Sequence, residues 1–320
     1  MNSPVVITTL NRYEHLKNCI GSLKKCNLAA ETDVYISVDY PPAEKYFAGY
    51  KKIVEYLQSP IDGFHNVQIF FQQKNLGSCD NSHFLYTKAF ETYDRLIYTE
   101  DDNEFSPAFL EYMNVMLEKF KDEKSVYAIC GYRWPFKLEK KETSFFSPFI
   151  SFWGCGLWKD KVRDFEDFRR KELVSYLKNG SSRRGFISWS PHVYKQAVYV
   201  ACEKHHMQIY RRDTEEKVYR DADFIVEMYM HIKGMKAIVP YVSKVRNMGH
   251  DGSGENCDDL NASLYEDQEI DMRDIFDGST EAVDLNTEER EALSCFHESN
   301  DPTGLKERLK LFLMVKFMMK

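Results

Sequence analysis

The stretch Leu96-Ile97-Tyr98-Thr99-Glu100-Asp101-Asp102-Asn103 has the pattern of an apolar strand that runs directly into three consecutive carboxylates. Acidic residues at the carboxyl end of a strand lie where open α/β sheets bind their ligands. Three adjacent carboxylates repel one another, so they need solvent or a cation, and Mg²⁺ and Mn²⁺ prefer oxygen ligands of this kind. The triplet therefore indicates a divalent-metal site for a phosphorylated ligand. Its alternative is a solvated acidic turn before a helix.

Strand and helix patterns alternate on both sides of this stretch. The expected strands cover residues 5–9, 33–39, 66–72, 95–99 and 126–131, and the expected helices cover 11–23, 46–57, 82–93 and 107–120. This alternation predicts an α/β fold with a mostly parallel central sheet and helices on both faces. The sequence lacks both Gly-x-Gly-x-x-Gly and Gly-x-x-x-x-Gly-Lys-Ser/Thr. A classical dinucleotide-binding fold and a P-loop are therefore disfavoured.

Length, net charge and cysteine content restrict the cellular compartment of the protein and the ligands that it can bind. The 320 residues are enough for one large domain or two modest ones, and the formal net charge of −7 argues against a general nucleic-acid binder. Eight cysteines are dispersed without a Cys-x-x-Cys pair, which favours reduced thiols in the cytoplasm over a zinc site or a disulfide framework. We see no secretory-signal pattern and no run of 18 apolar residues, so we expect a cytoplasmic protein without a membrane span.

Polar side chains follow four of the expected strands. The first strand ends near Thr8 and Arg12, the second at Asp39, the third before Asn75, and the fourth in the acid triplet. Because the carboxyl ends of parallel strands meet at one edge of a sheet, these four loops should converge. An arginine at a helix start can hold a phosphate, and an aspartate after a strand can accept from a ring N–H or a ribose hydroxyl. Alternatively, Arg12 is a surface helix residue and Asp39 a turn acid before prolines.

These motifs resemble those of the GT-A glycosyltransferases. Residues 5–12, Val38-Asp39, Asn75-Leu76-Gly77 and residues 98–102 are similar to the broad family-2 enzymes and, more closely, to the N-acetylglucosaminyltransferase I group. In that group the metal motif Glu-Asp-Asp is followed by a proline and a phenylalanine-containing helix, as it is here at residues 107–112. The resemblance covers roughly residues 4–250, and it is specific at the acid triplet and generic elsewhere. It implies a GT-A fold with a C-terminal helical extension.

The resemblance also implies residue roles. Arg12 and Asp39 would hold the uridine part of a nucleotide-sugar, and Asp102 would bind Mn²⁺ (or Mg²⁺) that bridges the diphosphate. Glu100 and Asp101 would reach sugar or ribose hydroxyls. The wider set of donor-binding candidates consists of Thr8, Arg12, Asp39, Asn75, Glu100, Asp101, Trp153 and Gly154.

An aromatic and glycine-containing segment, residues 145–158, lies in the middle of the chain. A loop of this kind can place a sugar ring against an aromatic face, and it resembles the segment that closes the donor pocket in the related enzymes. Trp153 and Gly154 are its donor-side candidates. The alternative is a buried strand with a glycine bend.

A transferase that inverts the anomeric centre needs a base for the acceptor hydroxyl. Asp221 and Asp223 precede a helical pattern that ends at Gly234, and this arrangement resembles the acidic base motif of the related groups. The spacing points to Asp223, but Ala222 stands where an acidic pair is expected, so the choice between Asp221 and Asp223 stays open. Both could simply cap the helix. His250, in a glycine-rich turn, is the second candidate on the metal side, although such a histidine is more often structural or solvated.

The chain is expected to divide into a glycosyltransferase domain, residues 1–256, and a C-terminal part, residues 257–320. Residues 1–132 would bind the nucleotide-sugar and residues 133–256 the acceptor. Residues 257–301 are acidic with few core-forming runs and suggest a peripheral excursion or a partly mobile tail. Residues 304–320 are basic and strongly apolar, which suits a helix on an anionic membrane surface or one docked on protein.

Together these features predict a metal-dependent, inverting glycosyltransferase that uses a nucleotide-sugar, with UDP-N-acetylglucosamine as the donor that the resemblance suggests. The acceptor would be a hydroxyl of a glycan or lipid-linked saccharide in surface polysaccharide synthesis, reached from the inner face of the cytoplasmic membrane. Two alternatives remain: a nucleotidyltransferase with a similar sheet, and a non-catalytic sugar-nucleotide or glycan binder that serves as an assembly partner.

Overall fold

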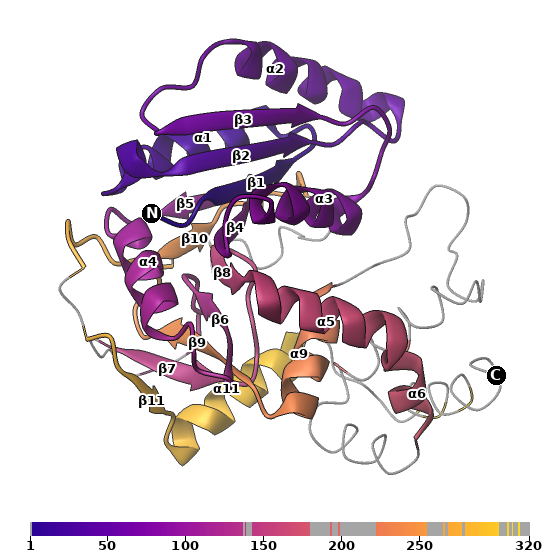
Figure 1. The fold of residues 1–320 in the computed structure, drawn as a ribbon, viewed down its shortest axis with the longest axis vertical. Coiled ribbons are helices and arrows are strands. Elements are labelled where there is room, and N and C mark those ends of the chain that lie inside the picture. The colour runs from indigo at the N-terminus through magenta and orange to yellow at the C-terminus, as the bar shows by residue number, and fades with distance from the viewer. Residues whose placement is uncertain are drawn as a thin grey trace. The chain divides into compact units, whose positions relative to one another are not determined.

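We describe the fold from a computed structural model, shown in Figure 1. It describes residues 2–136, 138, 143–179, 193, 198, 222–254, 265, 268–276, 279–300, 306, 309 and 313. The chain forms two compact units, the first from residues 1–160 and 236–284 and the second from residues 161–235 and 285–320. Each unit is described by itself below. Residues 236–284 return to the first unit after the excursion 161–235, and the domain boundary at residue 256 that the sequence suggested stays a prediction.

A nine-stranded sheet forms the centre of the first unit. Its strand order is β11-β7-β9-β6-β8-β4-β1-β2-β3. The pairs β3–β2, β2–β1, β1–β4, β6–β9 and β7–β11 are parallel, whereas β8 runs antiparallel to both β4 and β6, and β7 runs antiparallel to β9. The fold is therefore α/β with a mostly parallel sheet, as the alternating pattern predicted. The strands are β1 Val5–Thr9, β2 Asp33–Val38, β3 Asn66–Phe71, β4 Arg95–Glu100, β6 Val126–Cys130, β7 Ser144–Ser147, β8 Cys155–Trp158, β9 Lys236–Pro240 and β11 Ala282–Asp284.

Helices connect the parallel strands of this unit. They are α1 Tyr13–Leu23, α2 Phe47–Gln58, α3 Ser78–Phe90 and α4 Phe109–Lys119, with short 3₁₀ turns at Ala29–Glu31 and Glu44–Tyr46. In Figure 1, α3 lies in front of the sheet and α1 behind it. The buried face of α1 consists of Leu16, Cys19, Ile20 and Leu23, which is the face that the sequence pattern predicted. These helices cover the apolar strands of the sheet.

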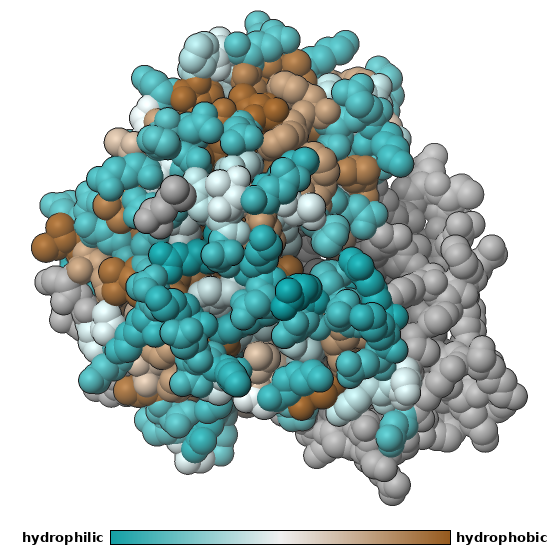
Figure 2. All heavy atoms as spheres, viewed as in Figure 1, coloured by the Kyte–Doolittle hydropathy of each residue, from teal (hydrophilic) through white to brown (hydrophobic). Residues whose placement is uncertain are grey.

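The edge strand β3 is the least covered strand of the parallel half. Its six residues are exposed or half-buried, whereas the neighbouring β2 is buried from Val34 to Val38. Figure 2 shows hydrophobic side chains near the top of the view, over α2 and β3. The core of the unit therefore lies further inside the sheet, around β1, β4, β8 and β6.

A second, two-stranded ribbon crosses the end of the main sheet. It pairs β5 (Asn103–Phe105) antiparallel with β10 (Val245–Asn247), so that Asn103 lies opposite Asn247 and Phe105 opposite Val245. The backbone N–H of Met248 also donates to the carbonyl oxygen of Asp102, 2.8 Å away. The ribbon thus brings the glycine-rich turn after residue 247 next to the acid triplet.

The second unit is helical in the residues described. Most of α5 (Lys159–Lys171) belongs to it, together with α6 (Leu173–Lys178), α9 (Ala222–Lys233) and α11 (Thr287–Asn300). Phe165 and Phe168 of α5 pack against Tyr229 of α9, with ring centroids 5.6 and 5.2 Å apart. Aromatic packing therefore holds α5 and α9 together.

Several elements differ from the expectations. Helix α3 begins at Ser78, four residues earlier than the pattern suggested, and the aromatic segment 145–158 is largely built from β7, a turn and β8. The acidic region after residue 257 contributes β11 and the 14-residue helix α11, so it is more structured than its composition suggested.

The C-terminal segment 304–320 also lies largely outside the described residues. Its described members include Leu309 and Leu313, whose side chains are 60% and 44% exposed. No helix within the described ranges has the length and apolarity needed to cross a lipid bilayer. The membrane-surface hypothesis for this segment therefore stays a prediction.

Candidate active site

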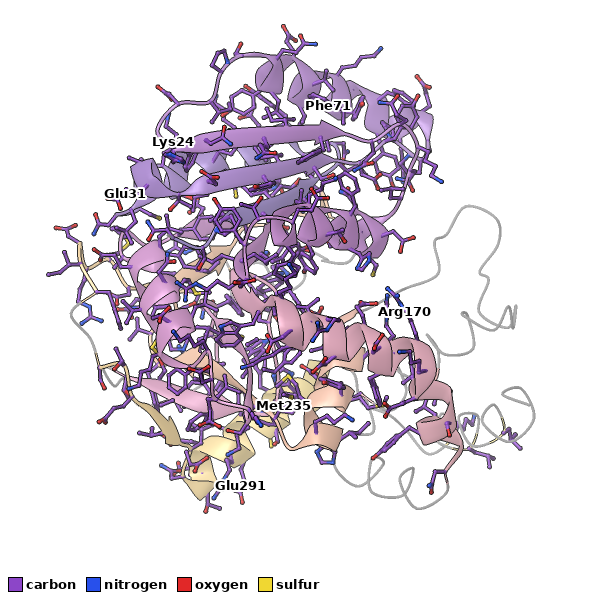
Figure 3. All side chains as sticks on the ribbon, viewed as in Figure 1. Lys24, Glu31, Phe71, Arg170, Met235 and Glu291 are labelled. Atoms are coloured by element: carbon purple, nitrogen blue, oxygen red, sulfur yellow. The ribbon has the colours of Figure 1, made fainter. Side chains whose placement is uncertain are left out.

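The polar strand ends meet at one edge of the sheet, as the parallel pairing requires. In Figure 3, Phe71 at the end of β3 lies at one edge, and Glu31, two residues before β2, lies at the opposite edge. Strands β1, β2 and β4 run parallel to β3, so Thr9, Asp39 and Glu100 belong to the Phe71 edge. Because β8 is antiparallel to β4 and pairs Cys155 with Tyr98, the start of β8 reaches the same edge.

Arg12 bridges the two aspartates of the triplet. Its Nη2 atom forms ion pairs with Asp101 Oδ1 and with Asp102 Oδ2, the latter at 2.8 Å. The second oxygen of Asp101 accepts from the hydroxyl of Thr9 at 2.6 Å, and the second oxygen of Asp102 accepts from the amide of Asn247 at 2.9 Å. Both aspartates are almost fully buried, with 3% and 5% of their surface exposed. The two aspartates therefore form a buried cluster whose negative charge Arg12 offsets in part, and they are not a solvated turn.

The charges in this cluster shift one another's pKa values. Burial lowers the pKa of Arg12, but Asp101, Asp102 and Glu100 outweigh burial and raise it well above its ordinary value. Burial also raises the pKa of Asp101, which Arg12 opposes. At Glu100, burial and the neighbouring Asp102 raise the pKa to about 8, while Arg12 and a hydrogen bond from Trp153 act in the opposite direction. The site thus holds more negative charge than one guanidinium neutralises, which suits an additional cation.

Glu100 is held by aromatic neighbours. Besides the hydrogen bond from Trp153, its Oε1 lies 3.5 Å from the phenol oxygen of Tyr98. That phenol is also hydrogen-bonded to the hydroxyl groups of Thr8 (3.1 Å) and Ser82 (3.2 Å). Thr8 therefore belongs to this edge through Tyr98, whereas the neighbouring Thr9 is the residue that contacts the aspartates.

Asp39 organises the loop after β3. Its Oδ1 accepts from the backbone N–H groups of Tyr40 and Leu76, each at 2.8 Å. Its Oδ2 accepts from the side-chain amide of Asn75 at 3.0 Å and from the N–H of Gly77 at 2.8 Å. Four donors occupy about the full acceptor capacity of a carboxylate. Asp39 and Asn75 thus act on each other and hold the start of α3 in place, and a role for Asp39 in binding uridine stays a prediction.

Gly154 and His250 make packing contacts of the kind that serve a structural role. Gly154 has a positive φ of +72°, and a Cβ there would lie 2.7 Å from Val245, so the turn into β8 requires glycine. The imidazole of His250 stacks on Tyr265 with centroids 3.9 Å apart and lies edge-on to Trp153 at 5.8 Å. Among the described residues His250 does not join Asp102 in a group of three or more metal-binding side chains.

Of the two base candidates, the structure describes Asp223, which belongs to the second unit. Asp223 is in the first turn of α9 and is half-buried, whereas Asp221 lies outside the described residues. The position in the first helical turn agrees with a capping role as well as with the catalytic one.

The donor chemistry at Asp102 fits a divalent metal. Carboxylate oxygens are preferred ligands of Mg²⁺ and Mn²⁺, and a carboxylate offers about four lone-pair sites. Arg12 and Asn247 use one site on each oxygen of Asp102, which leaves capacity for a metal bond. No cluster of three or more His, Cys, Asp or Glu ligands occurs in the described ranges, so the other ligands would come from a diphosphate and water.

Sequence reasoning missed three residues of this cluster. Thr9 holds Asp101, Asn247 holds Asp102, and Gly249 leaves room for the arginine and the aspartate. Thr9 was adjacent to a candidate and could have been included from its place at the strand end. Asn247 and Gly249 reach the site through the β5–β10 ribbon, and no local sequence signal marks that pairing.

A cavity of about 370 Å³ lies away from this edge, near the amino end of β3. It is lined by Leu57, Phe64, His65 and Val67 among others, and no carboxylate belongs to its wall. It therefore lacks the acidic chemistry of the strand-end cluster, and we place the candidate site at the cluster.

Replacing Gly249 with alanine should destabilise the protein. A Cβ at this position would overlap Asp102 Oδ2 and lie 3.1 Å from Arg12 Nη1, so the ion pair must shift. Overpacking of this kind costs about 1–3 kcal/mol in the free energy of unfolding. Gly21 in α1 is the matched control, since a Cβ there meets nothing within 4 Å and alanine favours a helix by roughly 0.5–1 kcal/mol. Urea denaturation should give opposite signs for the two variants, and equal effects would contradict the described packing.

The comparisons with known proteins give weak structural likenesses. No family model matches the chain, and no curated protein matches its sequence. S. aureus TarS is 12% identical with a TM-score of 0.38, over 62% of this chain and 34% of TarS. The mannosyltransferase PcManGT from Pyrobaculum calidifontis, in complex with GDP-Man and Mn²⁺, is 10% identical with a TM-score of 0.37, over 72% and 70% of the two chains. Mouse xyloside xylosyltransferase 1 is 10% identical with a TM-score of 0.34, over 59% and 75%.

The chain spans about a third of the length of TarS. At TM-scores below 0.5 these likenesses do not establish a shared activity. The functional proposal below therefore depends on the side chains at the sheet edge.

Proposed function

We propose that this protein is a metal-dependent, inverting glycosyltransferase that uses a nucleotide-sugar. The observation that carries the proposal is the buried cluster at the carboxyl end of β4, in which Arg12 bridges Asp101 and Asp102 while Trp153 contacts Glu100. Open α/β sheets bind their ligands at this edge, and the cluster combines a cation, carboxylates and an aromatic face there.

The divalent metal would be held by Asp102 and would neutralise charge that develops on the leaving diphosphate. Asp101 holds the guanidinium of Arg12, and Thr9 fixes the orientation of Asp101 through its hydroxyl. Arg12 in turn keeps two adjacent carboxylates from repelling each other, so Asp102 stays in one orientation before any ligand arrives. Trp153 presents an aromatic ring beside Glu100, and such a face can hold a sugar ring.

The acceptor hydroxyl needs a base, and we assign this role to Asp223, with Asp221 as the alternative. The donor we propose is UDP-N-acetylglucosamine, and the acceptor is a hydroxyl of a glycan or lipid-linked saccharide in surface polysaccharide synthesis. The donor and acceptor assignments depend on the resemblance to GT-A enzymes. A place on the inner face of the cytoplasmic membrane depends on the basic and apolar composition of residues 304–320.

Release of nucleoside diphosphate from a panel of UDP-, GDP- and dTDP-sugars tests the proposal. We expect slow hydrolysis of one donor in the presence of Mn²⁺ and none with EDTA. Asp102→Ala should lower this rate by about 100-fold or more, because it removes charge stabilisation of the leaving group. Asp62→Ala is the matched control, since this carboxylate is 89% exposed and pairs only with Lys24 among the contacts described.

The base is tested by Asp223→Asn. This variant should keep donor binding and lose acceptor transfer by about 100-fold or more. Release of free pyrophosphate instead of a nucleoside diphosphate would identify a nucleotidyltransferase. Donor binding without turnover, unchanged in Asp223→Asn, would identify a non-catalytic binder. Absence of both binding and turnover for every donor would reject the proposed function.

A further inference from the structure

Arg133 follows β6 and carries a cation that the described residues do not neutralise. Its side chain donates from Nη1 to the carbonyl oxygen of Phe136 at 2.9 Å, and its guanidinium lies 5.7 Å from the ring centre of Phe136. No carboxylate in the described ranges forms an ion pair with it, and Glu269 contributes only a longer-range attraction. Burial lowers the pKa of Arg133, yet a guanidinium stays protonated in proteins. The residue is therefore a partly buried positive charge that forms no ion pair with a described carboxylate.

Two buried polar atoms at this place also have no hydrogen-bond partner within the described part of the chain. They are Nε of Arg133, which is a donor, and Oε1 of Gln268, which is an acceptor. The two residues touch, because the side-chain amide of Gln268 donates to the backbone carbonyl of Arg133. Gln268 is 6% exposed. Buried donors and acceptors are rarely left unsatisfied in native proteins, so this arrangement points to a group that completes it.

The backbone around Arg133 is firmly held. Its N–H donates to the hydroxyl of Ser243 at 3.1 Å, and the N–H of Lys244 donates to the carbonyl of Gly131 at 2.8 Å. On the other side of Gln268, Nε of Arg246 donates to the Gln268 carbonyl at 3.0 Å. Gln268 is therefore hydrogen-bonded to both Arg133 and Arg246, which holds it in place.

Arg133 is separated from the acid cluster by two aromatic rings. Strands β4 and β6 both pair with β8 and run in the same direction, so Arg133 and Glu100 follow strands that end at the same edge. Tyr132, next to Arg133, packs edge-on against Trp153 with centroids 4.7 Å apart, and Trp153 contacts Glu100. Arg133 therefore follows a strand that ends at the same edge of the sheet as the acid cluster.

We infer that Arg133 and Gln268 form a binding site for an anionic oxygen group that carries or adjoins a hydroxyl. Arg133 would donate to the anionic oxygens, and Oε1 of Gln268 would accept from the hydroxyl. Two sources share this chemistry: the diphosphate of the donor, and an acidic sugar of the donor or acceptor. The assignment of a substrate class to this site rests on the proposed function. The experiment therefore measures anion binding, which needs no turnover of a donor.

The probes are inorganic pyrophosphate, D-glucuronate and D-glucose, each titrated in EDTA against the full chain and monitored by tryptophan fluorescence. The wild type should bind at least one of the two anions more tightly than glucose. Arg133→Gln should weaken the binding of that anion by about tenfold, equivalent to about 1.4 kcal/mol, and leave the binding of glucose unchanged. Arg95→Gln is the matched control, because Arg95 pairs with Glu118 at the opposite end of β4.

If Arg133→Gln loses affinity only for pyrophosphate, the site is assigned to the diphosphate. If it loses affinity only for glucuronate, the site is assigned to an acidic sugar. Anion binding that is absent in the wild type, or equal in Arg133→Gln and the wild type, overturns the inference. A second measurement, made on the wild type, applies if Arg133→Gln does not fold. The NMR resonance of the Arg133 Nε–H group is assigned by its loss in Arg133→Lys. Its chemical shift should change when the anion is added and stay the same when glucose is added. Because no donor turnover is needed, failure of the transferase assay leaves this test intact.

Discussion

Replacing Arg12 with methionine is expected to lower the free energy of unfolding by about 3–5 kcal/mol at neutral pH. Methionine keeps much of the side-chain length but removes the charge that bridges Asp101 and Asp102. Both carboxylates are at least 95% buried, so they would be left adjacent, charged and without a cation. Breaking a buried ion pair from one side costs far more than breaking a surface pair, because the remaining charge stays desolvated. Urea denaturation at pH 7.5 measures the loss.

The pH dependence of this loss distinguishes charge from packing. Without Arg12 the folded-state pKa of Asp101, which burial already raises, should rise further above the unfolded value of about 3.9. A carboxyl whose pKa is higher in the folded state than in the unfolded state destabilises the fold at pH values above the unfolded pKa. This destabilisation fades as the pH falls and the group takes up a proton. The deficit should thus be smaller at pH 5 than at pH 7.5. Arg95→Met, which breaks a partly exposed pair with Glu118, should cost about 1 kcal/mol or less. A deficit equal at both pH values would contradict the charge explanation.

The second large effect is expected for Asp271→Asn. Asp271 and Lys244 form an ion pair in which the side chains are 5% and 4% exposed, and Arg273 also pairs with Asp271 at 2.7 Å. The ammonium of Lys244 lies over the rings of Tyr112 (5.6 Å) and Phe276 (5.8 Å). Asparagine would remove the carboxylate charge that this buried ammonium pairs with, at a cost of about 3–5 kcal/mol in the free energy of unfolding.

Acid should remove the same stabilisation from the wild type. Burial raises the pKa of Asp271, but hydrogen bonds from Arg273 and Lys244 outweigh burial and hold it well below its ordinary range. A depressed carboxyl pKa stabilises the fold fully above the unfolded value of about 3.9, and this contribution is lost as pH falls toward the folded pKa. The difference between wild type and Asp271→Asn should therefore shrink below pH 4. Asp284→Asn is the control, since Asp284 is 71% exposed where it pairs with Lys236 and should cost about 1 kcal/mol or less. Equal costs for the two variants would refute the buried-pair account.

The sequence predicted the elements whose signal is local. Leu16, Cys19, Ile20 and Leu23 recur at helical spacing and are the buried face of α1. The strands from β1 to β4 were recognisable because each is a short apolar run between a helix pattern and a polar turn. The strand β8 was less clear, because its Gly156 and its aromatic neighbours are typical of both a loop and a buried strand.

The candidate site was predictable only in part, for a physical reason. The acid triplet and Arg12 could be named from the sequence, because strand-end chemistry depends on residue type and position along the chain. That Arg12 would bridge both aspartates depends on distances between loops. Asp39 shows the same limit: the sequence reveals a carboxylate after a strand, but not the four donors that surround it in the fold. Asn247 joins the cluster through a pairing between segments about 140 residues apart.

The position of β9 determines when the sheet can be completed during synthesis. In the sheet, β9 lies between β6 and β7, although it follows β7 in the chain by about 90 residues. The strands β3, β2, β1 and β4 can pair as soon as the first hundred residues have left the ribosome. The strands β7 and β11 reach the rest of the sheet only through β9, so they must wait until residue 240 has emerged. A nascent chain that stalls between residues 160 and 235 would therefore expose unpaired edges of β6 and β7, and this is the interval in which chaperone capture would matter most.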